Sequence, residues 1–206
     1  IGDQLRFWSA LSEFRKKYPN LILEPSVKTE EILQSSFPDL IVRANNINPE
    51  DLSSFQEDFD YHLPIGSMFG HEALIHKDKL SYPDFSLGWS FLKPEKLRAM
   101  FWKDKLMSLS EKPKIGFCWR SSILSGNRYR EYTDLLQWKD LLKSEKFSFV
   151  NLQYDLSHDE FIHKYNGLTK YFLDTGHLDQ KDDLEGAVAL ISNLDFVLSA
   201  GAAPSM

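Results

Sequence analysis

The amino-acid sequence predicts an α/β protein whose strands run parallel. Stretches with helical spacing of apolar residues alternate with short apolar runs of strand length, most regularly over residues 114–198. Strand and helix alternating at short intervals are typical of parallel sheets that helices cover. The chain has 206 residues, of which 42% are hydrophobic and 26% charged, as in ordinary globular proteins. This length suffices for one large domain or two small ones.

The first half of the chain is expected to begin with a helix. Leu5, Trp8 and Leu11 recur at helical spacing, and the pattern continues to Tyr18. Thr29 resembles an N-cap, because acidic residues follow it in what would be the first turn of a helix. The other expected elements of this half are strands at 21–24 and 40–42, a polar loop at 45–60 and a short helix at 66–69.

The second half is expected to repeat a strand–helix rhythm after a long helix at 94–110. The residues at 110–113 read as a hinge, and turn formers and aromatic residues at 82–94 mark a change of character before it. The expected strands are 114–119, 147–152, 171–173 and 196–198, and the expected helices are 135–143, one capped by Ser157 that runs to Tyr165, and 182–193.

Both ends of the chain are interpreted as cut. Gly2 and Asp3 stand directly before a helix, where a first strand normally precedes them, and only Ile1 does. The last strand runs into a Gly/Ala-rich loop, residues 199–203, that should lead into a further helix. We therefore expect incomplete sheets, and a chain that either forms a homodimer or tolerates an open sheet edge.

Composition and spacing argue against several classes of protein. A net charge of −6 disfavours a broad nucleic-acid-binding surface, and no apolar run is long enough for a membrane span. The single cysteine, Cys118, cannot form an internal disulfide, so we expect a reducing, cytoplasmic compartment and a buried thiol. The six histidines have no recognised metal spacing, and we predict no metal site.

The loop at 120–130 is the most informative candidate site. Arg120, Arg128 and Arg130 gather there with Ser121, just past the end of a predicted strand. Ligands of open parallel sheets lie outside the carboxyl ends of the strands, and guanidinium groups suit phosphate oxygens. A solvated basic loop that pairs with nearby acidic residues explains the same pattern. Residue types alone leave both interpretations open.

Three further positions at strand or helix ends are candidates. Asp3 could serve as a general base, although a first-turn acid that stabilises the helix dipole explains it as well. Gln153 and Tyr154, with Asp155 after them, follow a predicted strand and could contact a nucleobase or ribose, or could simply pack. The loop containing Gly201 could let the backbone approach a phosphate, and tight packing accounts for it equally.

Several of these segments match a known pattern in the same order. They are residues 115–121 (IGFCWRS), 127–132 (NRYREY) and 149–154 (FVNLQY), with shorter stretches at 1–4, 36–38, 60–67, 182–191 and 194–199. Together they resemble the heptosyltransferase-like glycosyltransferases of bacteria, a group often fused to tetratricopeptide repeats. The resemblance implies two Rossmann-like domains in the arrangement called GT-B, here residues 1–93 on the acceptor side, a linker helix and hinge at 94–112, and residues 113–206 on the nucleotide-sugar side.

The resemblance also implies roles for the candidate residues. Asp3 would be the catalytic base. The donor, a nucleotide-diphosphate sugar, would be bound without a metal or other cofactor, and the groups that would bind it are Arg120, Ser121, Arg128, Arg130, Gln153, Tyr154 and Gly201. The acceptor would be a hydroxyl of a glycan, lipid or protein.

One departure from the family pattern narrows these expectations. Gly201, Ala202 and Met206 stand where heptosyltransferases have an Asp-Thr pair and a later histidine, so an ADP-heptose donor is not supported. Three interpretations remain open: a glycosyltransferase with a hexose-like donor, a non-catalytic nucleotide-sugar-binding or scaffold module of the same fold, and an α/β protein with an unrelated phosphorylated ligand.

Overall fold

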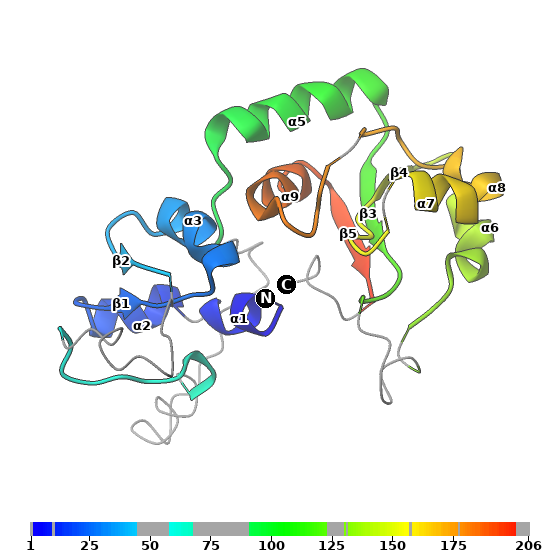
Figure 1. Cartoon of the computed structure of the whole chain (residues 1–206). Coiled ribbons are helices and arrows are strands. Elements are labelled where there is room, and N and C mark those ends of the chain that lie inside the picture. The colour runs from blue at the N-terminus through cyan, green and yellow to red at the C-terminus, as the bar shows by residue number, and fades with distance from the viewer. Residues whose placement is uncertain are drawn as a thin grey trace, which may run out of the picture. The chain divides into compact units, whose positions relative to one another are not determined.

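The structure is a computed structural model that divides into two compact units, Ile1–Lys93 and Pro94–Met206 (Figure 1). It describes residues 2–9, 11–44, 58–67, 91–122, 130, 132–156, 158–176 and 178–200. Each unit contains helices and parallel strands. The predicted α/β class is therefore confirmed, while the GT-B arrangement stays a prediction.

The first unit is built around a short parallel strand pair. Strands β1 (Ile22–Leu23) and β2 (Ile41–Val42) pair in parallel, with Ile22 opposite Ile41. The helices that accompany them are α1 (Gly2–Trp8), α2 (Leu11–Lys17), α3 (Val27–Ser36) and the 3₁₀ turn η2 (Ile65–Ser67). Both strands lie where the apolar runs predict them.

Two local predictions for this unit are wrong. The helix expected from Leu5 to Tyr18 is interrupted after Trp8, where the hydroxyl of Ser9 donates to the Arg6 carbonyl over 2.7 Å. Serine side chains compete in this way with the backbone ladder of a helix. The N-cap of α3 is Ser26, and Thr29 lies inside the helix, where its hydroxyl donates to the Ser26 carbonyl over 3.0 Å.

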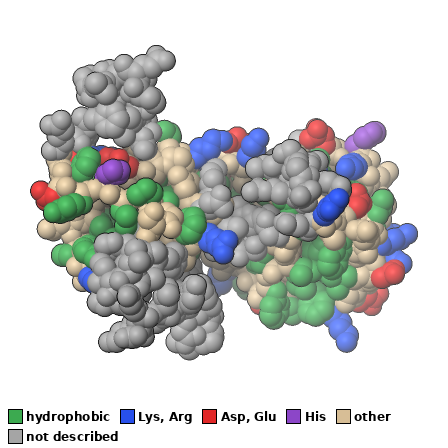
Figure 2. All heavy atoms as spheres, turned by 90° about the horizontal axis from the view of Figure 1, so that it is seen from below, with side chains coloured by type: hydrophobic (Ala, Val, Ile, Leu, Met, Phe, Trp, Pro, Cys, Tyr) green, Lys and Arg blue, Asp and Glu red, His purple; other side chains and the backbone are tan. Residues whose placement is uncertain are grey.

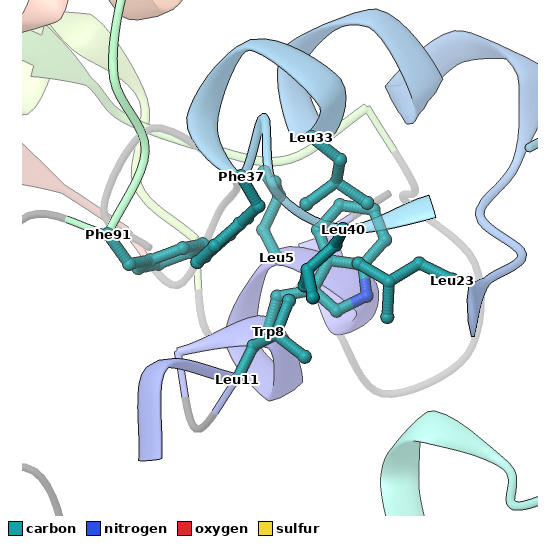
Figure 3. Close-up of a cluster of buried hydrophobic side chains, with 8 residues drawn as sticks. All are labelled: Leu5, Trp8, Leu11, Leu23, Leu33, Phe37, Leu40 and Phe91. Carbon is teal, nitrogen blue, oxygen red and sulfur yellow. The ribbon is translucent and has the colours of Figure 1, made fainter. Parts of the chain in front are cut away.

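Large apolar side chains from the helices, strands and loops described in this unit pack into a core. Figure 3 shows eight of them, and they are Leu5, Trp8, Leu11, Leu23, Leu33, Phe37, Leu40 and Phe91. Phe91 comes from far along the chain, and the backbone N–H of Lys93 donates to the Ser36 hydroxyl over 2.9 Å. Each fully buried side chain of this size stabilises the fold by about 1.5–3 kcal/mol, so the spacing of Leu5, Trp8 and Leu11 reflects burial as predicted.

The second unit holds a three-stranded parallel sheet with the order β4–β3–β5. The strands are β3 (Lys114–Cys118), β4 (Ser148–Asn151) and β5 (Phe196–Ser199). The helices are α5 (Lys96–Leu109), the 3₁₀ turn η5 (Leu135–Trp138), α6 (Lys139–Leu142), α7 (His158–Lys164), α8 (Asn166–Thr169) and α9 (Leu184–Ile191). The strand expected at 171–173 is a single bridge, which joins Phe172 to Phe149.

Helices cover both faces of this sheet (Figure 1). On one face, Cys118 and Val150 pack with Trp102 and Leu106 of α5 and with Leu190 of α9. On the other face, an aromatic cluster packs beneath the helices around α7, and its buried members are Phe117, Trp119, Leu135, Leu142, Phe149, Phe161, Tyr165 and Leu168. Parallel sheets are normally buried in this two-sided way.

Side chains cap some of the helix starts in this unit. The helix expected from Leu135 begins as the turn η5, where Asp134 and Gln137 form a reciprocal capping box. Asp183 caps α9, because its carboxylate accepts from the Gly186 backbone N–H over 2.9 Å. The expected cap at Ser157 lies outside the described residues. Helix α5, predicted as a linker, packs against α9 within this unit.

Candidate functional site

The candidate site lies at the carboxyl ends of the neighbouring strands β3 and β4. Arg120 and Ser121 follow β3, and Gln153 and Tyr154 follow β4. The two strands pair in parallel, so both exits point to the same edge of the sheet. Four of the residues that the sequence singled out are thereby brought together.

Gln153 connects the two exits. Its side chain is 2% exposed, and its amide nitrogen donates to the Arg120 carbonyl over 2.9 Å. Its amide oxygen accepts from the Arg120 backbone N–H over 3.3 Å. A buried amide costs free energy unless it is hydrogen-bonded, and here both ends of the amide are used. Gln153 therefore fixes the backbone at Arg120.

Arg120 forms an ion pair with Asp155. The guanidinium and the carboxylate are 2.5 Å apart, and the two side chains are only 14% and 12% exposed. The second carboxylate oxygen of Asp155 accepts from the amide of Gln153 over 2.6 Å. The carboxylate is thus held by two donors, and it neutralises the guanidinium. Sequence reasoning placed Asp155 at the strand exit but did not pair it with Arg120, because the pair depends on which strands are neighbours.

Tyr154 and Ser121 form a second link between the exits. The tyrosine hydroxyl donates to the Ser121 hydroxyl over 3.0 Å and accepts from the Ser122 backbone N–H over 3.3 Å. Ser121 is buried, whereas Tyr154 is half-buried. The phenol therefore holds the start of the loop that follows β3 and leaves part of its surface to the solvent.

Cys118 lies beneath this cluster as a buried thiol, as predicted. Its sulfur donates weakly to the Arg120 carbonyl over 3.4 Å and lies 3.7 Å from the amide oxygen of Gln153. Burial raises the pKa of Cys118 to about 11. At neutral pH the thiol is protonated, and it packs as an apolar side chain.

An open pocket of about 1210 Å³ adjoins the cluster. Ser122, Asn151 and residues 153–156 form the wall at the sheet edge, and parts of α7, α8 and residues 172–182 form the remainder. Two side-chain bonds anchor the far wall: Gln180 donates to the Asn151 carbonyl over 2.8 Å, and Lys105 donates to the Thr175 carbonyl over 2.6 Å. Ligand pockets commonly measure about 300–1,000 Å³, so a nucleotide-sized molecule fits this volume.

The other predicted site residues are not part of this cluster as described. Arg130 is exposed. Arg128 and Gly201 lie outside the described residues. The backbone of Asp3 lies in the first turn of α1, but its side chain is not among those that the structure describes.

The described residues offer neither a membrane helix nor a metal cluster. No helix among them is both long and apolar enough to cross a membrane, and none of their His, Cys, Asp and Glu side chains form a group of three or more suited to a metal ion. On the face shown in Figure 2, described basic and acidic side chains are interspersed.

Comparison with known proteins gives one distant relative. The chain is 31% identical over 209 residues to a protein of Caulobacter vibrioides named Protein FlbA. The alignment covers 96% of this chain and 34% of that protein, so the chain spans about a third of its relative's length. No family model and no solved structure matches the chain.

Proposed function

We propose that this chain is part of a glycosyltransferase that takes its sugar from a nucleotide-diphosphate donor and transfers it to a hydroxyl of a glycan, lipid or protein. One observation carries the proposal. Polar residues from the ends of β3 and β4 are hydrogen-bonded into a single cluster beside a nucleotide-sized pocket. The carboxyl ends of parallel strands are where such folds bind ligands.

The chemistry of the cluster suits a diphosphate. The guanidinium of Arg120 can offer a planar pair of donors to phosphate oxygens. Next to it, the Ser122 backbone N–H donates to the Tyr154 hydroxyl, which donates to the Ser121 hydroxyl, and a phosphate oxygen could replace an acceptor in this chain of neutral donors. Once released from Asp155, the guanidinium would place positive charge beside a departing diphosphate and stabilise it without a metal ion.

In the proposed reaction, the acceptor oxygen forms a bond to the anomeric carbon of the sugar. The bond from that carbon to the diphosphate oxygen breaks, and its electron pair leaves with the diphosphate. The acceptor proton passes to a base, for which the sequence offers Asp3. Arg128, Arg130 and Gly201 are proposed as further contacts of the donor.

The ion pair favours a second candidate function. Because Asp155 already neutralises Arg120, the cluster is also suited to a module that binds a nucleotide sugar weakly and transfers nothing. The two functions differ in turnover and agree in nucleotide binding.

The test is a thermal-shift and calorimetric screen of the chain against UDP, ADP, GDP, CMP and their common sugar conjugates. Selective stabilisation by one nucleoside diphosphate, lost in Arg120→Ala and Arg128→Ala, supports donor binding. No stabilisation by any probe overturns it. Sugar transfer that Asp3→Ala abolishes while nucleotide binding survives selects the enzyme over the non-catalytic module.

A further inference from the structure

We propose that Asp155 is an internal competitor for the phosphate site, so that a bound diphosphate must take the Arg120 guanidinium from the Asp155 carboxylate. This inference rests on the proposed function, because it assumes that Arg120 contacts the donor. In addition, it assigns to Asp155 a role in setting the affinity of the site for the nucleotide. Asp155 then lowers nucleotide affinity, whereas an ordinary ligand-binding residue would raise it.

The first observation is the geometry of the pair. Arg120 and Asp155 are 2.5 Å apart with little exposed side-chain surface. The contact joins one guanidinium nitrogen to one carboxylate oxygen, so a phosphate oxygen that took the same nitrogen would have to displace the carboxylate. Two anions beside one guanidinium repel each other, so the carboxylate weakens phosphate binding even where the ligand uses the other N–H donors.

The second observation is that the carboxylate has its own anchor. Gln153 donates to Asp155 over 2.6 Å and is itself held by the Arg120 backbone. If the guanidinium swings toward a ligand, the carboxylate keeps this hydrogen bond and stays at the pocket wall, which Asp155 lines. The arginine can therefore exchange partners while the backbone of both strand exits remains fixed.

The alternative is that Asp155 contacts the ligand directly, for example by accepting from ribose hydroxyls. The two roles predict opposite effects of removing the charge. Without the competing carboxylate, an anion gains the full attraction of Arg120; without a ligand-binding carboxylate, the ligand loses a hydrogen bond.

The experiment is isothermal titration calorimetry of the whole chain with UDP, ADP, GDP and inorganic pyrophosphate. The variants are Asp155→Asn, Asp155→Ser as a second carboxylate removal, and Asp155→Asn combined with Arg120→Ala. Asp140→Asn is the matched control, because Asp140 also forms an ion pair, with Lys143, but is not among the residues that line the pocket. Circular dichroism verifies that each variant is folded.

We expect Asp155→Asn and Asp155→Ser to bind the preferred diphosphate about tenfold more tightly than the natural chain, a difference of about 1.4 kcal/mol. The gain should vanish in the double variant, and Asp140→Asn should change affinity by less than about twofold. Affinity that is unchanged or weaker in both Asp155 variants overturns this inference and leaves the proposed function standing. An equal gain in Asp140→Asn overturns it too, because the gain would then come from the lower negative charge of the whole chain. Absence of binding by every chain and probe overturns the proposed function as well.

Discussion

Gly116 in the central strand β3 allows a sharp test of the packing that supports the site. It is buried between its neighbours Val150 and Val197, and β3 leads directly to Arg120. A methyl group built at Gly116 would lie 2.6 Å from the Cδ1 atom of Leu194 and closer still to that of Leu152. Real side chains do not approach so closely, so the substitution Gly116→Ala must move at least one leucine.

The expected cost follows from these neighbours. Leu152 is fully buried in the cluster around α5 and α9, so it cannot swing into solvent. Overpacking of this kind costs about 1–3 kcal/mol of unfolding free energy. Replacing glycine in a strand recovers about 0.5–1 kcal/mol through lower chain entropy. The difference is a net cost of up to about 2.5 kcal/mol. Because the added methyl group overlaps two leucine side chains, we expect Gly116→Ala to lower the unfolding free energy by about 1–2 kcal/mol, within that range.

The assay is urea denaturation followed by circular dichroism, with the m-value compared between variants. Gly167→Ala is the matched control, because Gly167 lies in α8 and a methyl group there meets nothing within 4 Å. That control should be neutral or stabilising by up to about 1 kcal/mol. If Gly116→Ala were as stable as the natural chain at an unchanged m-value, the described packing of β3 would be wrong.

Two further predictions concern the residues beneath the site. Gln153→Leu should lower the unfolding free energy by about 1–3 kcal/mol, measured by the same denaturation, because it leaves the backbone of Arg120 without its buried partners; a neutral result would show that these bonds contribute nothing. Burial raises the pKa of Cys118 from 9.0 to about 11, so the folded state holds this proton more tightly than the unfolded state. The resulting stabilisation is complete below pH 9 and is lost as the pH rises toward 11, by up to about 2–3 kcal/mol. The fall in stability over that alkaline range should be shallower in Cys118→Ala, and equal slopes would contradict the raised pKa.

The strands of the second unit could be predicted because buried strands appear in the sequence as short runs of apolar residues. Residues 114–119, 147–152 and 196–198 are short apolar runs between turn formers, and β3, β4 and β5 lie within or beside them. A strand buried on both faces needs apolar side chains at nearly every position. The parallel class followed from the helices between these runs.

Other features depend on contacts that no local pattern records. At the break after Trp8 the Ser9 hydroxyl donates to the Arg6 carbonyl, and at the start of α3 the hydroxyls of Ser26 and Thr29 are hydrogen-bonded to each other. The role of Gln153 in the site could not be predicted from a local pattern either. Sequence reasoning placed Gln153 near a nucleoside, whereas the structure uses its amide to join two strand exits. Such a role becomes visible only when β3 and β4 are known to be neighbours.

The central claim is that a nucleoside diphosphate binds at the carboxyl ends of β3 and β4. The most direct test is a ¹⁵N NMR titration of the isotope-labelled chain with the diphosphate that gives the largest thermal shift. We expect the backbone amides of Arg120, Ser122, Gln153 and Tyr154 to shift first and most, and we expect Arg120→Ala to abolish these shifts. Saturable shifts confined to other parts of the chain, or none at millimolar ligand, would contradict it.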